Sequence, residues 1–222
     1  FVANVSHELR TPLQSIKLGL ETINNGHAAD DAESQKKIIP LVLQQTARME
    51  NIVNDLLSLS RIELQEHIRP NDKIDINEII SHSVDLHQEI LKKNNIICNI
   101  DKKTKDPIIN GDRNRLIEVF NNLIDNAIKY SEKNKRITIT TRSDDKNLIA
   151  IVKDEGIGIS RKNIPQITER FFRANPAKSK EVGGTGLGLA IVKHIVNQHR
   201  AEMNISSEEN KGTTISINFP KS

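Results

Sequence analysis

Two amphipathic patterns in the first 66 residues constrain the fold of this chain more than any other feature. In the first pattern, apolar residues recur every three or four positions, at Val5, Leu9, Leu13, Ile16, Leu20 and Ile23. In the second, they stand at Val42, Met49, Ile52, Leu56 and Leu59. This spacing is typical of α-helices with one buried face. A polar break between Asn24 and Asp31 separates the two patterns, which predicts an antiparallel helical hairpin.

A single hairpin cannot bury apolar faces of this length. We therefore expect residues 1–66 to dimerise into a four-helix bundle. The alternative is a monomeric hairpin that packs on the rest of the chain. Pro12 and Pro40 each remove a helical hydrogen bond, so we expect a bend at Pro12 and either a bend or the first helical turn at Pro40. The helical pattern begins at the first residues without a capping residue, so we expect the natural protein to begin earlier.

The helical pattern ends in the polar segment 67–73, which contains Pro70 and is predicted to be a linker. In residues 74–222 we expect helices at 77–93, 114–130 and 188–199. Short runs rich in β-branched residues predict strands at 96–100, 136–142, 148–154, 204–206 and 213–219. This alternation predicts an α/β sandwich with helices on one face of a mixed sheet.

Composition narrows the classes of function. Only 3% of the residues are aromatic and the net charge is +3, so a surface that stacks on or neutralises nucleic acid is not expected. Cys98 is the single cysteine, which fits a reducing compartment. No apolar run reaches the roughly 18 residues that a membrane helix needs. We expect a soluble cytoplasmic segment without direct membrane contact.

His7 is the first candidate for chemistry. At 100° per residue it lies about 200° from both Val5 and Leu9, away from the apolar face of its helix. Glu8 follows it directly, and Thr11 lies one turn further on. An exposed imidazole beside a carboxylate and a hydroxyl is a plausible nucleophile with a proton-accepting partner. A surface histidine is more often simply solvated, so this cluster alone does not establish a function.

Asparagines on one helix face indicate a ligand site. Asn122, Asn126 and Lys129 are spaced by four and three residues within the helix predicted at 114–130. Asparagine is a poor residue for a helix interior, so its repeated use favours a ligand. Neutral oxygen donors suit a Mg²⁺ ion that is bound chiefly by phosphates and water. A solvated polar face is the alternative.

Two glycine motifs follow the asparagines. The sequence from Asp154 to Gly158 comes directly after a predicted strand, and such a motif by itself also fits an ordinary turn. The sequence Gly183–Gly188 opens into a helix, which predicts a phosphate-binding loop. It is neither a Walker loop nor a Rossmann fingerprint. The charged segment 160–182 between the two motifs is predicted to be a mobile lid.

Together these motifs resemble those of sensor histidine kinases, in order and in spacing. His7–Leu13 resembles the H box, and Asn122–Tyr130 the N box. The segment Asp154–Gly158 resembles the G1 box, Glu169–Arg173 the F box, and Gly184–Leu189 the G2 box. The resemblance implies a dimeric phosphotransfer hairpin followed by an ATP-binding domain of the Bergerat (GHKL) type.

The same resemblance implies roles for individual residues. His7 is phosphorylated on its outer ring nitrogen, Glu8 holds or deprotonates the other nitrogen, and Thr11 takes part in dephosphorylating the partner. Asn126 holds Mg²⁺, and Asp154 binds the adenine amino group. Further residues implied in the ATP site are Asn122, Lys129, Tyr130, Gly156, Gly158, Ile159, Phe172, Arg173, Gly184, Thr185, Gly186, Leu187 and Gly188.

The implied partners are a second copy of the chain and the receiver domain of a response regulator. The full-length protein is expected to be anchored in the bacterial inner membrane. The segments at 55–63, 168–173 and 194–199 further resemble the phosphate-regulon sensor kinases. Arg200 and Ala201 stand where this family commonly has a glycine. Ala201 can be accommodated if the turn avoids positive φ.

Two other functions remain open. A GHKL ATPase of the chaperone or mismatch-repair type would explain the asparagine and glycine motifs but not His7 and Glu8. A degenerate kinase that only binds nucleotide and acts as a dimeric interaction protein would be expected to lack Asn126, Asp154 or the glycine loop. The pairs His82/His87 and His194/His199 are five residues apart, which does not place either pair on one helix face as a metal site requires.

Overall fold

The computed structural model describes residues 2–25, 31–65 and 67–221 of the chain. It divides into two compact units, one up to Ser58 and the other from Leu59 onward. The limits inferred from the sequence, with a hairpin at 1–66, a linker at 67–73 and a second domain at 74–222, stay a prediction.

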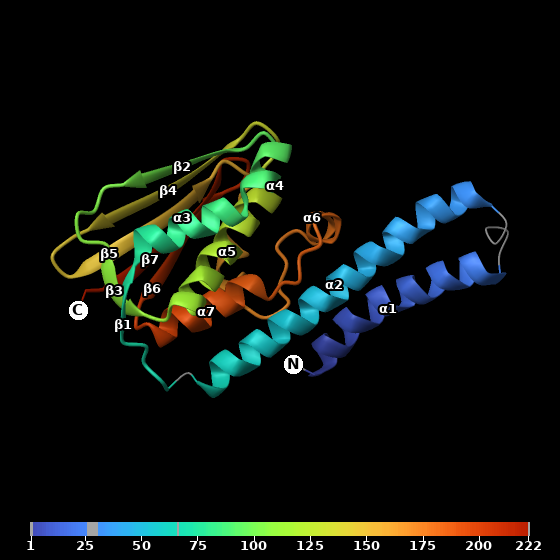
Figure 1. Cartoon of the computed structure of the whole chain (residues 1–222), viewed down its shortest axis with the longest axis horizontal. Helices are drawn as coiled ribbons and strands as arrows, with labels where there is room; N and C mark the ends of the chain where they lie inside the picture. Colours follow the sequence, from blue (N-terminus) through green and yellow to red (C-terminus); the bar gives the residue numbers. More distant parts are fainter. Residues whose placement is uncertain (1, 26–30, 66, 222) are drawn as a thin grey trace. The chain divides into compact units, whose positions relative to one another are not determined.

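The first unit is a helical hairpin formed by α1 (Val2–Asn25) and most of α2 (Ala32–Leu64) (Figure 1). Pro12 lies inside α1 and Pro40 inside α2, so both helices continue past their prolines. The two helices approach closely at Gly19, where an added Cβ would lie 2.6 Å from Cγ2 of Val42. Most of the predicted turn, residues 26–30, lies outside the described residues.

Many apolar side chains of the hairpin remain exposed. Leu13 and Leu20, both part of the first predicted pattern, are 55% and 53% exposed. Other exposed apolar residues of this unit are Leu18, Ile39, Leu41, Leu43, Val53 and Leu57. Scattered exposed leucines are normal, but a concentration on two paired helices is typical of a surface that packs against another molecule. The exposed residues therefore support the expected dimer, which stays a prediction.

The second unit contains a mixed five-stranded sheet of order β2-β4-β5-β7-β6. Its strands are β2 (Ile97–Lys102), β4 (Arg136–Ser143), β5 (Asn147–Asp154), β6 (Glu202–Glu208) and β7 (Gly212–Pro220). β2 is parallel to β4, and the other neighbouring pairs are antiparallel. A separate two-stranded ribbon pairs β1 (Asp72–Asp75) with β3 (Ile108–Gly111).

Three helices cover one face of this sheet: α3 (Ile76–Leu86), α5 (Arg113–Lys129) and α7 (Gly188–Gln198) (Figure 1). Alternate residues of β4 and β5 are buried, as expected for strands with one face against a helical layer. Phe120 of α5, Ile191 of α7 and Ile139 of β4 are completely buried in the resulting core. The predicted α/β sandwich with a mixed sheet is confirmed.

The structure differs from the expected elements in the first part of this unit. The helix predicted at 77–93 is divided at His87 into α3 and a short α4 (Gln88–Lys93), because the His87 imidazole bonds to the Ser83 carbonyl. β1 lies partly in the predicted linker, and β3 was not predicted. The segment expected to be a lid contains the 3-10 turn η1 (Ile164–Gln166) and the short helix α6 (Pro176–Glu181).

The C-terminus of α7 has a regular helix-ending turn although the expected glycine is absent from Arg200 and Ala201. The amide of Arg200 donates to the Asn197 carbonyl and that of Ala201 to the Val196 carbonyl, both at 3.0 Å, which is a Schellman motif. Arg200 takes the left-handed conformation of this motif, with φ of 53°. The turn therefore does not avoid positive φ, but the strain falls on Arg200 instead of Ala201.

His199, the last residue before this turn, ties α7 to the start of α5. It is buried, and its Nε2 accepts a hydrogen bond of 3.0 Å from the Asp112 amide, whereas Nδ1 lies 2.8 Å from the Ile195 carbonyl. Both contacts are satisfied only by the neutral ring with its proton on Nδ1. Burial lowers the pKa of His199 from its ordinary value of 6.5.

The substitution of Leu20 by Glu should weaken self-association of the chain by at least about tenfold, because burying one leucine contributes about 1.5–3 kcal/mol. Sedimentation velocity across a protein concentration series measures this. Leu86→Glu is the matched control, since Leu86 is 59% exposed but lies on α3 of the second unit. Equal dissociation constants for wild type and Leu20→Glu would contradict a hairpin-mediated dimer.

The free energy of unfolding should fall as the pH drops below about 6.5, the ordinary pKa of histidine, down to the lowered pKa of His199. The unfolded state binds a proton in this window that the folded state does not, so acid favours unfolding. Urea unfolding of wild type and His199→Gln between pH 7.5 and 5.0 tests this. We expect the variant to lose part of the pH dependence. If the two slopes are identical, His199 does not carry the effect.

Candidate functional site

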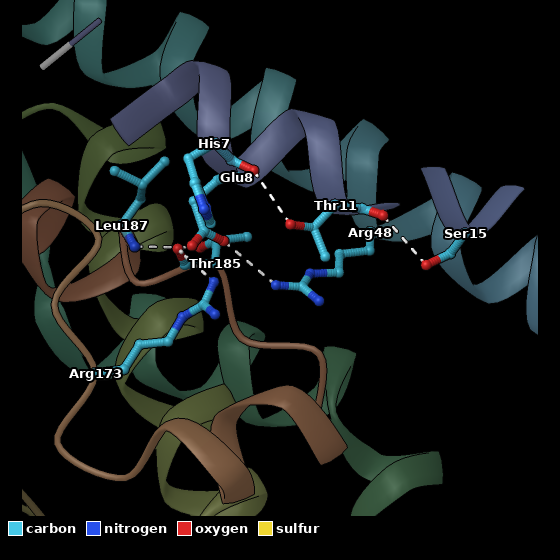
Figure 2. Close-up of polar contacts among 8 residues, drawn as sticks. All are labelled: His7, Glu8, Thr11, Ser15, Arg48, Arg173, Thr185 and Leu187. Carbon is cyan, nitrogen blue, oxygen red and sulfur yellow. Dashed lines mark hydrogen bonds and ion pairs between the residues drawn. The ribbon is translucent and has the colours of Figure 1, made fainter. Parts of the chain in front are cut away.

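His7 lies on an exposed part of α1, as its position in the helical pattern predicted. Thr11, one turn further along the same helix, donates from its hydroxyl to the His7 carbonyl at 3.3 Å. Ser15 repeats this contact by donating to the Thr11 carbonyl at 3.2 Å. Figure 2 shows these residues along one stretch of α1. The structure thus places a solvent-accessible imidazole on a regular helix.

The Glu8 carboxylate is held by a residue that sequence reasoning missed. Its Oε2 accepts from Nη2 of Arg48, which lies on α2, at 3.3 Å (Figure 2). This ion pair joins the two helices of the hairpin next to His7. No spacing signal could have indicated Arg48, because it stands 40 residues from Glu8. The predicted action of Glu8 on the His7 ring stays a prediction.

The second unit brings the asparagine motif of α5 next to the second glycine motif. A Cβ added to Gly188 would lie 2.6 Å from Oδ1 of Asn122, so a side chain at this position would have to displace the Asn122 amide group. The Asn122 amide donates to the Glu118 carbonyl of its own helix at 2.9 Å, which fixes the direction of Oδ1. Asn126, one turn further along α5, is half-exposed. The Asn122 amide oxygen therefore lies beside the start of α7, and Asn126 follows it on α5.

Lys129 and Tyr130 close α5 with contacts that were not predicted. Nζ of Lys129 lies 2.6 Å from the Asp125 carboxylate. The Tyr130 hydroxyl is 2.9 Å from the hydroxyl of Ser179, which belongs to α6 and is buried. α6 is therefore fastened to the end of α5. A phosphate group that binds Lys129 must compete with Asp125 for its ammonium group.

The first glycine motif packs against the same end of α5. The Ile157 amide donates to the Tyr130 carbonyl at 3.0 Å. The Ile159 amide, at the far side of the motif, donates to the hydroxyl of Ser207 at 2.8 Å. Gly156 is buried, and Gly158 has a φ of 66°. These contacts fix the backbone of the motif between α5 and β6.

Asp154, at the end of β5, is a carboxylate with a raised pKa. Burial raises this pKa from the ordinary 3.8, against hydrogen bonds to Oδ1 from the amides of Gly156 at 2.8 Å and Thr213 at 3.2 Å. An ionised carboxylate has capacity for further hydrogen bonds on its other oxygen. A ligand amine next to Asp154 would thus meet an oriented acceptor.

The second glycine motif ends in a helix terminus without a side-chain cap. α7 begins at Gly188, and no side chain of a described residue caps it with a hydrogen bond. The first amide groups of such a helix are available to an anion, which the helix dipole also favours. The Thr185 hydroxyl holds the loop by accepting from the Leu187 amide at 3.2 Å (Figure 2).

The F-box segment packs directly on this loop. The Phe171 amide donates to the Gly186 carbonyl at 2.8 Å, and a Cβ on Gly186 would lie 2.9 Å from Cα of Phe171. Nη2 of Arg173 approaches the Thr185 carbonyl at 3.4 Å (Figure 2). Phe172 is half-buried beside them, and the Gly184 amide donates to the Ser179 carbonyl at 2.9 Å. The predicted loop residues thus form one backbone cradle.

This cradle fits a nucleotide. The uncapped start of α7 suits phosphates, and Asp154 suits an exocyclic amine. The amide oxygens of Asn122 and Asn126 suit a Mg²⁺ ion that is bound mainly by phosphate oxygens.

Among the described residues, no helix is long and apolar enough to cross a lipid bilayer.

Two protein-family profiles match this chain. The profile of the family described as histidine kinase-, DNA gyrase B- and HSP90-like ATPase matches residues 111–222. The profile of the His Kinase A (phospho-acceptor) domain matches residues 1–65. The sensor protein kinase WalK of Staphylococcus aureus is 37% identical over 222 residues, which cover 99% of this chain and 53% of that protein. The chain spans about half or less of the length of the WalK relatives.

Two solved structures are similar over nearly the whole chain. The Acinetobacter baumannii histidine kinase AdeS has a TM-score of 0.76 and 26% identity, with coverage of 97% of this chain and 98% of that one. The histidine kinase ThkA, solved in complex with the response regulator protein TrrA, has a TM-score of 0.77 and 25% identity. It covers 100% of this chain, and the match covers 61% of that one.

Replacement of Asp154 by Ala should weaken binding of an adenine nucleotide by about 10- to 100-fold, since a hydrogen bond to a charged group contributes about 1.5–3 kcal/mol. Isothermal titration with a non-hydrolysable ATP analogue measures this. Asp144→Ala is the control, because Oδ1 of Asp144 likewise accepts from two backbone amides but lies in an exposed turn. Equal losses of affinity in both variants would contradict the role of Asp154.

Proposed function

The chain belongs to the family of histidine kinase-, DNA gyrase B- and HSP90-like ATPases, and we propose that it transfers the γ-phosphoryl group of ATP to His7 and then to a response regulator. The predicted resemblance to sensor histidine kinases is confirmed. The narrower resemblance to phosphate-regulon kinases stays a prediction. The proposal rests above all on one observation: an exposed histidine on a helical hairpin is joined, in one chain, to a nucleotide cradle.

In the proposed function, ATP binds in the second unit. Asp154 accepts a hydrogen bond from the adenine amino group, and the start of α7 receives the phosphates. Lys129 and Arg173 neutralise phosphate charge. Asn126, with Asn122 beside it, holds a Mg²⁺ ion whose charge stabilises the phosphate oxygens. The remaining predicted residues shape the walls of the site: Tyr130, Gly156, Gly158, Ile159, Phe172, Gly184, Thr185, Gly186, Leu187 and Gly188.

The proposed reaction at His7 needs a neutral imidazole. Its Nε2 lone pair attacks the γ-phosphorus, a nitrogen–phosphorus bond forms, and the bond to the bridging β–γ oxygen breaks to release ADP. The proton remains on Nδ1, where the Glu8 carboxylate accepts it in a hydrogen bond or removes it. Arg48 orients this carboxylate. The protein contributes little covalent chemistry, because positioning and charge neutralisation provide most of the lowering of the activation barrier.

The proposed second step moves the phosphoryl group from His7 to an aspartate of a receiver domain. The solved complex of the similar kinase ThkA with the response regulator TrrA supports such a partner. We further propose that Thr11 takes part in the reverse dephosphorylation of the regulator. The match to the phospho-acceptor domain and the exposed leucines of the hairpin support a homodimer. Similarity to longer sensor kinases supports a cytoplasmic position and membrane anchorage of the full-length protein.

Incubation with γ-³²P-ATP and Mg²⁺ tests the proposal. The wild type should acquire a label that is lost in acid and survives alkali, as expected for a phosphorylated nitrogen. His7→Gln should acquire none. His82→Gln is the matched control, because His82 is also an exposed helical histidine, on α3. Labelling of His7→Gln at the wild-type level would contradict the proposal, as would ATP hydrolysis without any labelled protein.

A further inference from the structure

The last turn of α2 carries a carboxylate that reaches the F-box segment. Residues 59–64 close α2 but belong to the second compact unit. The Glu63 carboxylate accepts from Nη2 of Arg170, and Nε2 of His194 on α7 lies 3.7 Å from the same oxygen. The side chains of Glu63 and Arg170 are about one-third exposed, at 34% and 35%. Solvent therefore has access to this ion pair, which is only partly buried.

A second set of contacts fastens the following residues to the C-terminus of α7. The Gln198 amide donates to the carbonyls of Gln65 at 3.1 Å and Ile68 at 3.3 Å. In the opposite direction, the Arg69 guanidinium donates to the carbonyls of Asn197 at 3.2 Å and Gln198 at 3.0 Å. A cation is favoured at this end of a helix, where carbonyl groups lack helical partners. The segment after α2 is thus attached to α7 and is not a loose tether.

Both sets of contacts connect the end of α2 to the phosphate loop, Gly183–Gly188. Arg170 is followed by Phe171, whose left-handed backbone, with φ of 65°, donates to the Gly186 carbonyl. Gly186 has a φ of 76° and no room for a side chain against Phe171. α7, for its part, starts at Gly188 directly after the loop and ends at Gln198, where the second attachment lies. A displacement of the end of α2 therefore acts on the loop through Arg170 and through α7.

We propose that Glu63 is a positioning residue for the nucleotide site, which acts through Arg170 to hold the phosphate loop in its binding conformation. The role of Glu63 in catalysis rests on the proposed function, whereas the coupling of Glu63 to the phosphate-binding loop does not. A partly exposed ion pair suits a regulated contact, because it contributes modestly and can be broken by a small movement. A conformational change at the end of α2 would thereby alter nucleotide binding through the loop, without itself contacting the nucleotide.

Hydrogen exchange of the full chain tests the coupling. Glu63→Gln should speed exchange in peptides that cover residues 171–187 by about two- to fivefold, the effect expected for a partly exposed ion pair. Affinity for a non-hydrolysable ATP analogue should fall by a similar factor, since loop order and binding are linked. Glu33→Gln is the matched control, because Glu33 is also a carboxylate of α2 in an ion pair, with Lys37 at 3.4 Å. It should change neither quantity.

A double-mutant cycle with Arg170→Gln separates positioning from a general loss of stability. The effects of the two substitutions should be less than additive in the double variant, because both break the same Glu63–Arg170 ion pair. Exchange in β5 and β7 should stay at the wild-type rate in all variants. Unchanged exchange and affinity in Glu63→Gln, or fully additive effects, would overturn the inference. If the wild type acquires no phosphoryl label but the loop responds to Glu63→Gln, the proposed function fails and the coupling stands.

Discussion

The nucleotide site depends on the pairing of α5 with α7, which is fixed at two points. At one end the His199 ring accepts from the amide of Asp112, the residue that caps α5. At the other end Gly188 lies against Asn122. The two contacts are ten residues apart on α5 and eleven apart on α7, so helices running in opposite directions span the same length between them. Because Gly188 starts α7, this pairing also sets where the phosphate loop lies.

The pairing of α5 with α7 brings together segments that are far apart in the sequence. Tyr130 at the end of α5 receives the Ile157 amide and contacts Ser179, so the first glycine motif and α6 are placed relative to α5. Gly186 receives the Phe171 amide, which places the F-box segment relative to the start of α7. Asp154 is held in turn by the amides of Gly156 and Thr213. Backbone amides are the donors in four of these five hydrogen bonds.

The sequence predicted the long elements and the residue types of the site. The helices α1, α2, α5 and α7 follow from apolar periodicity, and the five strands of the main sheet follow from β-branched runs. The ribbon of β1 and β3 was missed because Asp72–Asp75 is short and polar, and its strands are specified by each other. The helix expected at 77–93 is divided because His87 bonds to a carbonyl of its own turn, a local contact that periodicity does not report.

The contacts that adjust the site could not be predicted, because they join residues far apart in the chain. Arg48 reaches Glu8 across 40 residues, Ser179 reaches Tyr130 across 49, and Arg170 reaches Glu63 across 107. No motif spacing records such pairs. Arg200 is a different case, since a glycine was expected at this turn, and a Schellman motif supports the left-handed arginine.

The most direct test of the α5–α7 cradle is an NMR titration of the ¹⁵N-labelled chain with a non-hydrolysable ATP analogue and Mg²⁺. The largest shifts should fall on the amides of Gly186, Leu187 and Gly188 and on the side-chain amides of Asn122 and Asn126. Amides of β1 and β3, away from the glycine motifs, should move little. Shifts concentrated outside α5, α7 and the two glycine motifs would contradict the account.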